Sequence, residues 1–231
     1  MTKCYARYSQ IDQLRGFAII LMIIFHFFYD LTLFGYTSID FQQNRFWYLF
    51  PRCIVVLFLL CSGISLQLSS SHKSVSNIIT RALKLALVAL LISISTYILF
   101  PTRWIYFGTI HCISLSAILA IPFIKRIKFS PIVAILLIIL PLIWKNTLFW
   151  PELSHKSMDY IPIIPWFAYF LFGMYLASIK NHLVKLNFIS SSLKTAKLNT
   201  ILELMGKKSL WIYLLHQPII YGIILGINTY F

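Results

Sequence analysis

Long apolar runs separated by short polar segments make up most of this chain of 231 residues. A helix needs roughly 20 apolar residues to cross about 30 Å of hydrocarbon. Seven runs approach that length: residues 16–36, 46–68, 82–100, 104–124, 129–144, 160–179 and 209–231. The ten-residue alternation typical of membrane barrels does not occur. The pattern therefore predicts an all-α polytopic membrane protein, with about seven transmembrane helices bundled in a single domain over residues 1–231.

Composition agrees with the membrane class. Hydrophobic residues make up 59% of the chain and charged residues only 11%, whereas a soluble domain carries about 25% charged residues. The first apolar run has no small-residue cleavage site, so we interpret it as a retained helix rather than a signal peptide. The longest polar stretch, residues 180–208, is basic, and we expect a loop with a short surface helix around residues 200–205.

Lysine and arginine are distributed unevenly between the two ends of the predicted spans. If the spans alternate in direction, most of these residues fall on one side, and the other side receives Arg45, Arg52, Arg103, Lys145 and Lys156. The more basic side of a membrane protein faces the cytoplasm. The sequence therefore predicts a cytoplasmic N-terminus and a C-terminus on the outer side.

The net charge of +14 suggests a nucleic-acid partner at first, but the positions of the charges argue against one. They report topology and contact with the anionic headgroups of the lipid bilayer instead. The cysteines form no CxxC pair, and most lie in apolar runs, so we interpret them as small core-filling residues rather than metal ligands or disulfide partners. They are Cys4, Cys53, Cys61 and Cys112.

Five ionisable side chains fall at similar depths in the predicted spans: His26, Asp30, Arg52, His111 and His216. A helix rises about 1.5 Å per residue, which places His26 about 16 Å beyond Arg15, and Asp30 follows one turn later on the same face. Ionisable groups at such depths cost a few kcal/mol each and should turn inward to find partners. We expect Arg52 and Asp30 to form a structural ion pair, and Asp30 to fix the tautomer of His26.

Two interpretations of this group remain open. The simpler one is a buried salt bridge, with histidines bonded to helix carbonyls. The gathering of three histidines at one depth favours a hydrated, reactive or ion-conducting cavity instead. The predicted cytoplasmic rim also has two interpretations, since its basic residues either contact headgroups or dock a polyanionic substrate such as a phosphorylated cofactor. The rim residues are Arg15, Arg81, Lys84 and Lys207.

Five segments occur in a characteristic order: "IDQLRGFAIILMIIFHFFYDLTLFG", "FLLCSGISL", "YFGTIHCISLS", "MDYIPIIPWFAYFLFGMYLA" and "LMGKKSLWIYLLHQPIIYG". Together they resemble the bacterial branch of the heparan-alpha-glucosaminide N-acetyltransferase catalytic-domain family, over nearly the whole chain. Arg15 and His26 also match the signature of the wider transmembrane acyltransferases, in which ten residues separate a basic residue from a histidine.

The resemblance implies an acetyltransferase of the bacterial inner membrane, in a homodimer. Cytoplasmic acetyl-CoA would be the acyl donor, and a sugar or glycolipid on the other side of the membrane would be the acceptor. The reaction would use no metal ion. The phosphates of the CoA part would contact the rim residues Arg15, Arg81, Lys84 and Lys207. His26 would be the general base, oriented by Asp30, and His111 or His216 would donate to the thioester oxygen. Direct transfer and an acyl-histidine intermediate both fit this assignment.

The chain departs from the lysosomal members in two respects. They place the catalytic histidine near the outer end of the first matching helix, whereas here no histidine lies between His26 and His72. The chain also has fewer spans and lacks their lumenal domain. Two other functions are compatible with the sequence: a proton-coupled carrier or export factor for a small anion or glycan, and a non-catalytic assembly subunit.

Overall fold

A computed structural model of the protein describes residues 8–70, 74–143, 155, 157–179 and 193–230. Within these residues the regular structure is helical, apart from one isolated bridge between Phe107 and Tyr160, which confirms the all-α prediction. The contacts divide the chain into two compact units. The terminal unit comprises Met1–Phe58 and Leu186–Phe231, and the central unit is Leu59–Lys185. The single domain over residues 1–231 stays a prediction.

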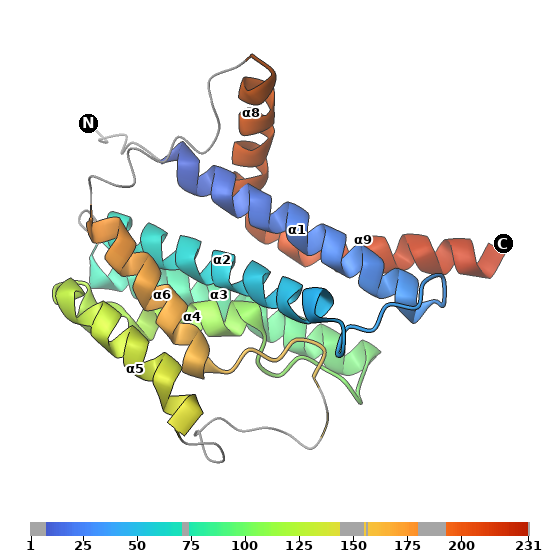
Figure 1. The fold of residues 1–231 in the computed structure, drawn as a ribbon, viewed down its shortest axis with the longest axis horizontal. Helices are drawn as coiled ribbons and strands as arrows, with labels where there is room; N and C mark the ends of the chain where they lie inside the picture. Colours follow the sequence, from blue (N-terminus) through green and yellow to red (C-terminus); the bar gives the residue numbers. More distant parts are fainter. Residues whose placement is uncertain (1–7, 71–73, 144–154, 156, 180–192, 231) are drawn as a thin grey trace. The chain divides into compact units, whose positions relative to one another are not determined.

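The terminal unit contains helix α1 (Ser9–Leu33), the first half of α2 (Arg45–Ser70), α8 (Leu193–Lys207) and α9 (Ser209–Tyr230). Helices α1 and α9 lie side by side and run in the same direction (Figure 1). An aromatic cluster between the end of α1 and the start of α2 fixes the connection between these helices. It consists of Phe25, Phe28, Tyr29, Phe41, Trp47 and Phe50.

Two glycines set the distance between α8 and α1. An added Cβ at Gly16 would overlap the carbonyl oxygen of Leu202, and one at Gly206 would overlap that of Asp12. The backbones of α1 and α8 therefore approach more closely than larger side chains would permit. The predicted short helix around residues 200–205 is thus longer than expected and docks on α1. The rest of the predicted loop, residues 180–192, lies outside the described residues.

Asp40 caps the turn that precedes α2. One of its carboxylate oxygens accepts the backbone N–H groups of Gln43 and Gln42, each at 2.8 Å. These hydrogen bonds, that from Gln43 first, hold the pKa of Asp40 below its ordinary value because they stabilise the ionised carboxylate. Asn44 then accepts the N–H of Phe46 at 3.0 Å, which supplies a side-chain cap to α2.

The central unit contains the second half of α2, followed by α3 (Val75–Leu99), α4 (Thr109–Leu119), α5 (Ser130–Ile143) and α6 (Ile163–Ser178). An added Cβ at Gly63 of α2 would overlap the carbonyl of Phe170, and one at Gly173 of α6 would overlap that of Leu60. These reciprocal contacts show that the backbones of α2 and α6 approach closely at both glycines. Phe170 and Leu171 are almost fully buried beside them and form part of the core.

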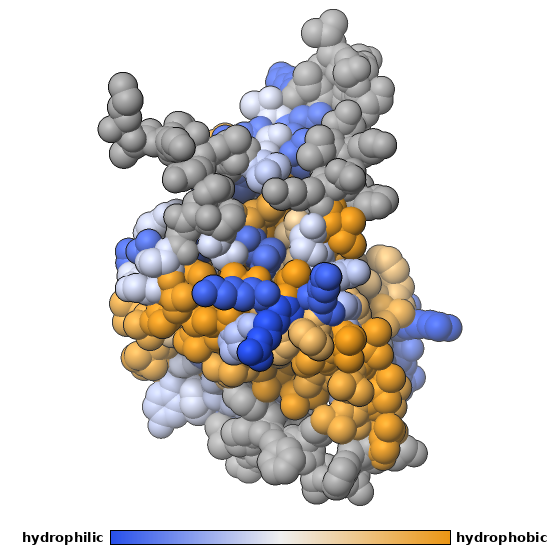
Figure 2. Space-filling model, turned by 90° about the vertical axis from the view of Figure 1, so that its left-hand side faces the viewer, coloured by the Kyte–Doolittle hydropathy of each residue, from blue (hydrophilic) through white to orange (hydrophobic). Residues whose placement is uncertain are grey.

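Four helices in the described part of the chain are long and apolar enough to span a membrane: α1, α2, α3 and Ser209–Thr229 of α9. Shorter apolar helices cover Thr109–Leu119, Ile127–Ile143 and Ile163–Ser178. Hydrophobic residues cover broad areas of the face drawn in Figure 2, as expected for a protein surrounded by lipid. The structure thus supports an integral membrane protein, while the number of seven spans and the orientation stay predictions.

The predicted span over residues 104–124 is wrong in its extent, because its α-helical part is only Thr109–Leu119, followed by a short 3-10 helix at Ile121–Phe123. Polar side chains of α3 bind the backbone that precedes it: Ile105 donates its N–H to Thr96 Oγ1 at 3.0 Å, and its carbonyl accepts Ser93 Oγ–H at 2.6 Å. Non-helical backbone is tolerated at such a place when neighbouring helices satisfy its hydrogen bonds. The hydropathy of the segment does not reveal these partners.

Candidate functional site

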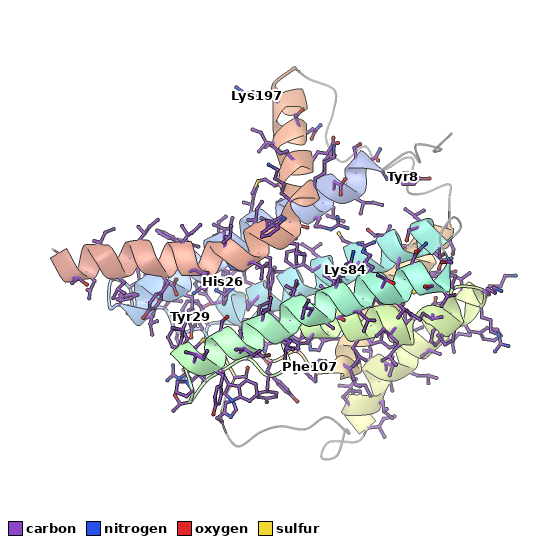
Figure 3. The ribbon with its side chains drawn as sticks, turned by 180° about the vertical axis from the view of Figure 1, so that it is seen from behind. Tyr8, His26, Tyr29, Lys84, Phe107 and Lys197 are labelled. Atoms are coloured by element: carbon purple, nitrogen blue, oxygen red, sulfur yellow. The ribbon has the colours of Figure 1, made fainter. Side chains whose placement is uncertain are left out.

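Two histidines from opposite ends of the chain meet in the terminal unit. His26 lies on α1, where Figure 3 labels it, and His216 lies on the neighbouring helix α9. Their ring centroids are 4.8 Å apart and the planes are inclined by 62°, an edge-to-face contact. The prediction that ionisable residues of different spans lie at similar depths is therefore confirmed for His26 and His216.

The hydrogen bonds of His216 fix its tautomer. Its Nδ1 lies 2.7 Å from the carbonyl oxygen of Tyr213, and because a carbonyl can only accept, Nδ1 carries the proton. In the neutral ring Nε2 is then an acceptor, and this atom is buried without a hydrogen-bond partner. His26 Nδ1 is also buried and unpartnered. Each ring thus has a nitrogen free to bind a polar group.

Asp30 is held by an amide rather than by a cation. It is fully buried, and Gln217 Nε2 lies 2.9 Å and 3.1 Å from its two carboxylate oxygens. Gln217 is the neighbour of His216 on α9, and its Oε1 is buried and unpartnered. The contacts of Asp30 with Gln217 and of His26 with His216 therefore join two successive turns of α1 to adjacent residues of α9.

Two predicted interactions of Asp30 are wrong. Arg52 does not pair with it: the guanidinium lies 3.5 Å from the ring centroid of Tyr48 and donates to the carbonyl of that residue, one turn earlier on α2. Among the described contacts Asp30 also makes no hydrogen bond to His26. Counting residues gives the depth of a side chain but not the rotation of its helix, and Arg52 is on an exposed side of α2.

His111 belongs to the central unit and has a different set of partners. Its Nδ1 accepts the N–H of Gly108 at 3.1 Å, so the neutral ring carries its proton on Nε2, which lies 3.0 Å from Ser93 Oγ. Ser93 in turn donates to the carbonyl of Ile105. His111 therefore clamps α3 to the start of α4, and both of its ring nitrogens are engaged. Asp159 supports the same helix end by accepting the N–H of Thr109 at 2.8 Å.

The predicted rim residues are divided between the two units. In the terminal unit Arg15 forms an ion pair with Asp12 at 3.1 Å and is only 15% exposed, and Lys207 on α8 pairs with Glu203. Arg81 and Lys84 are exposed on α3 of the central unit. Their common role at one anion site stays a prediction.

The described cysteines and His155 do not form a metal site. Cys61 and Cys112 are buried free thiols, as expected of core-filling residues, whereas Cys53 is exposed. Among the described residues no group of three or more His, Cys, Asp or Glu side chains could hold a metal ion. His155 stacks on Trp104 with ring centroids 5.5 Å apart. Cys4, His72 and His182 lie outside the described residues.

Comparison with protein families gives one match over most of the chain. The model of the heparan-alpha-glucosaminide N-acetyltransferase catalytic domain matches residues 7–218, which include the whole histidine pair and the Asp30–Gln217 contact. The chain belongs to this family. Membership confirms the resemblance seen in the sequence and indicates a membrane acetyltransferase. No curated protein and no solved structure matches the chain significantly.

Gln217 is the residue of this site that sequence reasoning missed. The sequence "LLHQPIIYG" places two adjacent polar residues in the middle of an otherwise apolar helix, and the first of them was recognised as His216. Adjacent residues on a helix are about 100° apart, so both can face a neighbouring helix that lies alongside. A second buried polar group beside a buried histidine is the signal that indicates Gln217.

Proposed function

We propose that this family member transfers an acetyl group from cytoplasmic acetyl-CoA to a hydroxyl or amine of a sugar or glycolipid on the opposite side. The membrane would be a bacterial inner membrane, with the N-terminus inside and the C-terminus outside. The observation that carries the proposal is the contact between His26 and His216, each with a buried ring nitrogen that has no partner. Family membership supplies the class of reaction.

The proposed reaction needs one proton transfer in each direction. An imidazole nitrogen of His26 removes a proton from the acceptor as the acceptor's oxygen or nitrogen attacks the thioester carbonyl carbon. The C–S bond then breaks, and the departing CoA sulfur takes the proton from the imidazolium. The products are the acetylated acceptor and the free CoA thiol, so no further reactant is required.

His216 is assigned a role beside His26. Its neutral ring has Nδ1–H bound to Tyr213, so Nε2 cannot donate to the thioester oxygen and is instead able to accept a hydrogen bond from the acceptor. An amine acceptor has an N–H for each of the two ring nitrogens, one acting as base and one as orienting acceptor, whereas a hydroxyl gives its single proton to His26, and His216 Nε2 then accepts from another hydroxyl of the sugar. Asp30 and Gln217 act as positioning residues that keep α9 against α1.

The donor end of the substrate is assigned by charge. CoA carries several phosphate oxygens, for which lysine and arginine are the usual protein partners. Lys207 is 42% exposed and follows the α1–α8 contact, and Arg15 lies on α1 eleven residues before His26. Arg81 and Lys84 are the candidates in the central unit. A homodimer, implied by the resemblance, remains part of the proposal.

The proposal is tested with purified protein in proteoliposomes, given acetyl-CoA with a radiolabelled acetyl group on one side and envelope glycans on the other. We expect release of CoA thiol and appearance of the label in the glycan fraction, both dependent on the protein. Intact acetyl-CoA, together with protein-dependent proton flux in its absence, would assign the carrier function instead. Neither transfer nor flux would leave the protein as an assembly subunit and refute the proposal.

A further inference from the structure

Helix α8 lies steeply across the two spans of its own unit. Figures 1 and 3 show α1 and α9 side by side, with α8 projecting away from them at the end where both begin. Helices α1 and α9 are long and apolar enough to cross a membrane. A helix that crosses such spans at their end is roughly parallel to the membrane surface, in the headgroup region.

The contacts of α8 leave an apolar face uncovered. Leu202 and Gly206 are buried against α1, as the glycine contacts require. Leu198, Ile201 and Leu204 are 45%, 46% and 54% exposed. These three residues follow one another at intervals of three, so they form one strip along the helix, distinct from the strip that contacts α1.

Basic residues accompany this apolar strip. Lys197, labelled near the outer end of α8 in Figure 3, is exposed, and so are Lys207, the last residue of the helix, and Lys208, which follows it. The acidic residue of the helix, Glu203, is paired with Lys207. An apolar strip flanked by lysines is typical of helices that lie in the interface of a membrane with anionic lipids.

We propose that α8 lies in the leaflet next to the start of α1 and binds the headgroups of anionic phospholipids. Leu198, Ile201 and Leu204 enter the boundary between headgroups and acyl chains, while Lys197 and Lys208 contact lipid phosphates. The charge complementarity and the crosswise position of α8 together favour this occupant over a second protein chain. The proposal does not depend on the acetyltransferase reaction.

Nitroxide labels test the position of α8 in the full-length protein. Cysteines replace Leu198, Ile201 or, as the matched control, Thr200, in a variant in which Cys4 and the exposed Cys53 are replaced by serine. The protein is placed in phosphatidylcholine bilayers with or without phosphatidylglycerol. Accessibility to oxygen, which concentrates in lipid, is compared with accessibility to a water-soluble nickel complex. We expect the labels at Leu198 and Ile201 to favour oxygen, and the label at Thr200 to favour nickel.

The lysines are tested with the same labels. Phosphatidylglycerol should move the labels at Leu198 and Ile201 deeper. K197Q with K208Q should abolish this shift, whereas the matched pair K125Q with K128Q, exposed lysines of the central unit, should preserve it. The proposal would be overturned by labels that favour nickel in both bilayers, by labels excluded from both reagents as in a protein interface, or by a lipid-dependent shift equally lost in both lysine pairs. Protection of the labels by added CoA alone would likewise assign the face to substrate.

Discussion

The contact between Asp30 and Gln217 makes a quantitative prediction about stability. Replacing Gln217 by leucine removes both hydrogen bonds to a carboxylate that is fully buried. Hydrogen bonds to charged groups contribute about 1.5–3 kcal/mol, and an unsatisfied buried group adds its own desolvation cost. The carboxylate can limit the loss by taking up a proton. We therefore expect Q217L to lower the free energy of unfolding by about 2–3 kcal/mol.

A double-mutant cycle separates the hydrogen bonds from other effects of the substitution. Replacing both partners by apolar groups can be nearly neutral, since no polar group is then left unpaired. D30L with Q217L should therefore be more stable than the sum of the single variants, with a coupling energy of about 2 kcal/mol. Gln67→Leu serves as the control because the hydrogen bond of Gln67 within the described residues is a long one, 3.5 Å, to the carbonyl of Ile124.

The assay is reversible unfolding in mixed micelles, followed by far-UV circular dichroism and repeated in bicelles. Q217L should unfold well before the wild type, and Q67L close to it. If Q217L proves as stable as Q67L, and the double variant equals the sum of the singles, the carboxylate is not held by the amide. The assignment of α9 to the partner face of α1 would then fail as well.

Three further predictions concern other contacts. G206A should lower the free energy of unfolding by about 1–3 kcal/mol, because the added methyl group would overlap the backbone of Asp12. G222A is the control in the same unfolding assay and should not destabilise the protein, because no described atom lies near the added methyl group. S93A and H111A should each destabilise the protein by about 1 kcal/mol or more and show coupling in a double-mutant cycle, as expected for a structural clamp. The lowered pKa of Asp40 adds stability that is present above the unfolded carboxyl pKa and is lost as the pH falls through the folded value. Hydrogen exchange at the turn before α2 should show this pH dependence in the wild type and lose it in D40A.

The apolar pattern predicted the helical class and the similar depth of His26 and His216, because burial in lipid leaves a strong signal in sequence. The depth count from Arg15 placed His26 in the middle of a span, and the structure joins His26 to His216. Similar depth brought the two residues together because both side chains also face the contact between α1 and α9. The family resemblance over the same segments was confirmed by the match to residues 7–218.

The errors arise where rotation and long-range partners decide. Arg52 has the expected position along α2 but faces Tyr48 instead of Asp30, and no residue count reveals that rotation. The segment before α4 reads as a continuous apolar span, yet hydroxyl groups of α3 bind its backbone and permit a non-helical course. The docking of α8 depends on the absence of a side chain at Gly206, which hydropathy does not register.

The central claim is that the His26–His216 pair is the place where the acetyl group is transferred. The most direct measurement is the single-turnover rate of acetyl transfer from labelled acetyl-CoA by H26Q and the wild type, both in lipid bilayers. General-base catalysis typically contributes at least about 100-fold. We predict a loss of that size in the maximal single-turnover rate of H26Q, with little change in the acetyl-CoA concentration that gives half of that rate. Transfer by H26Q at the wild-type rate would contradict it.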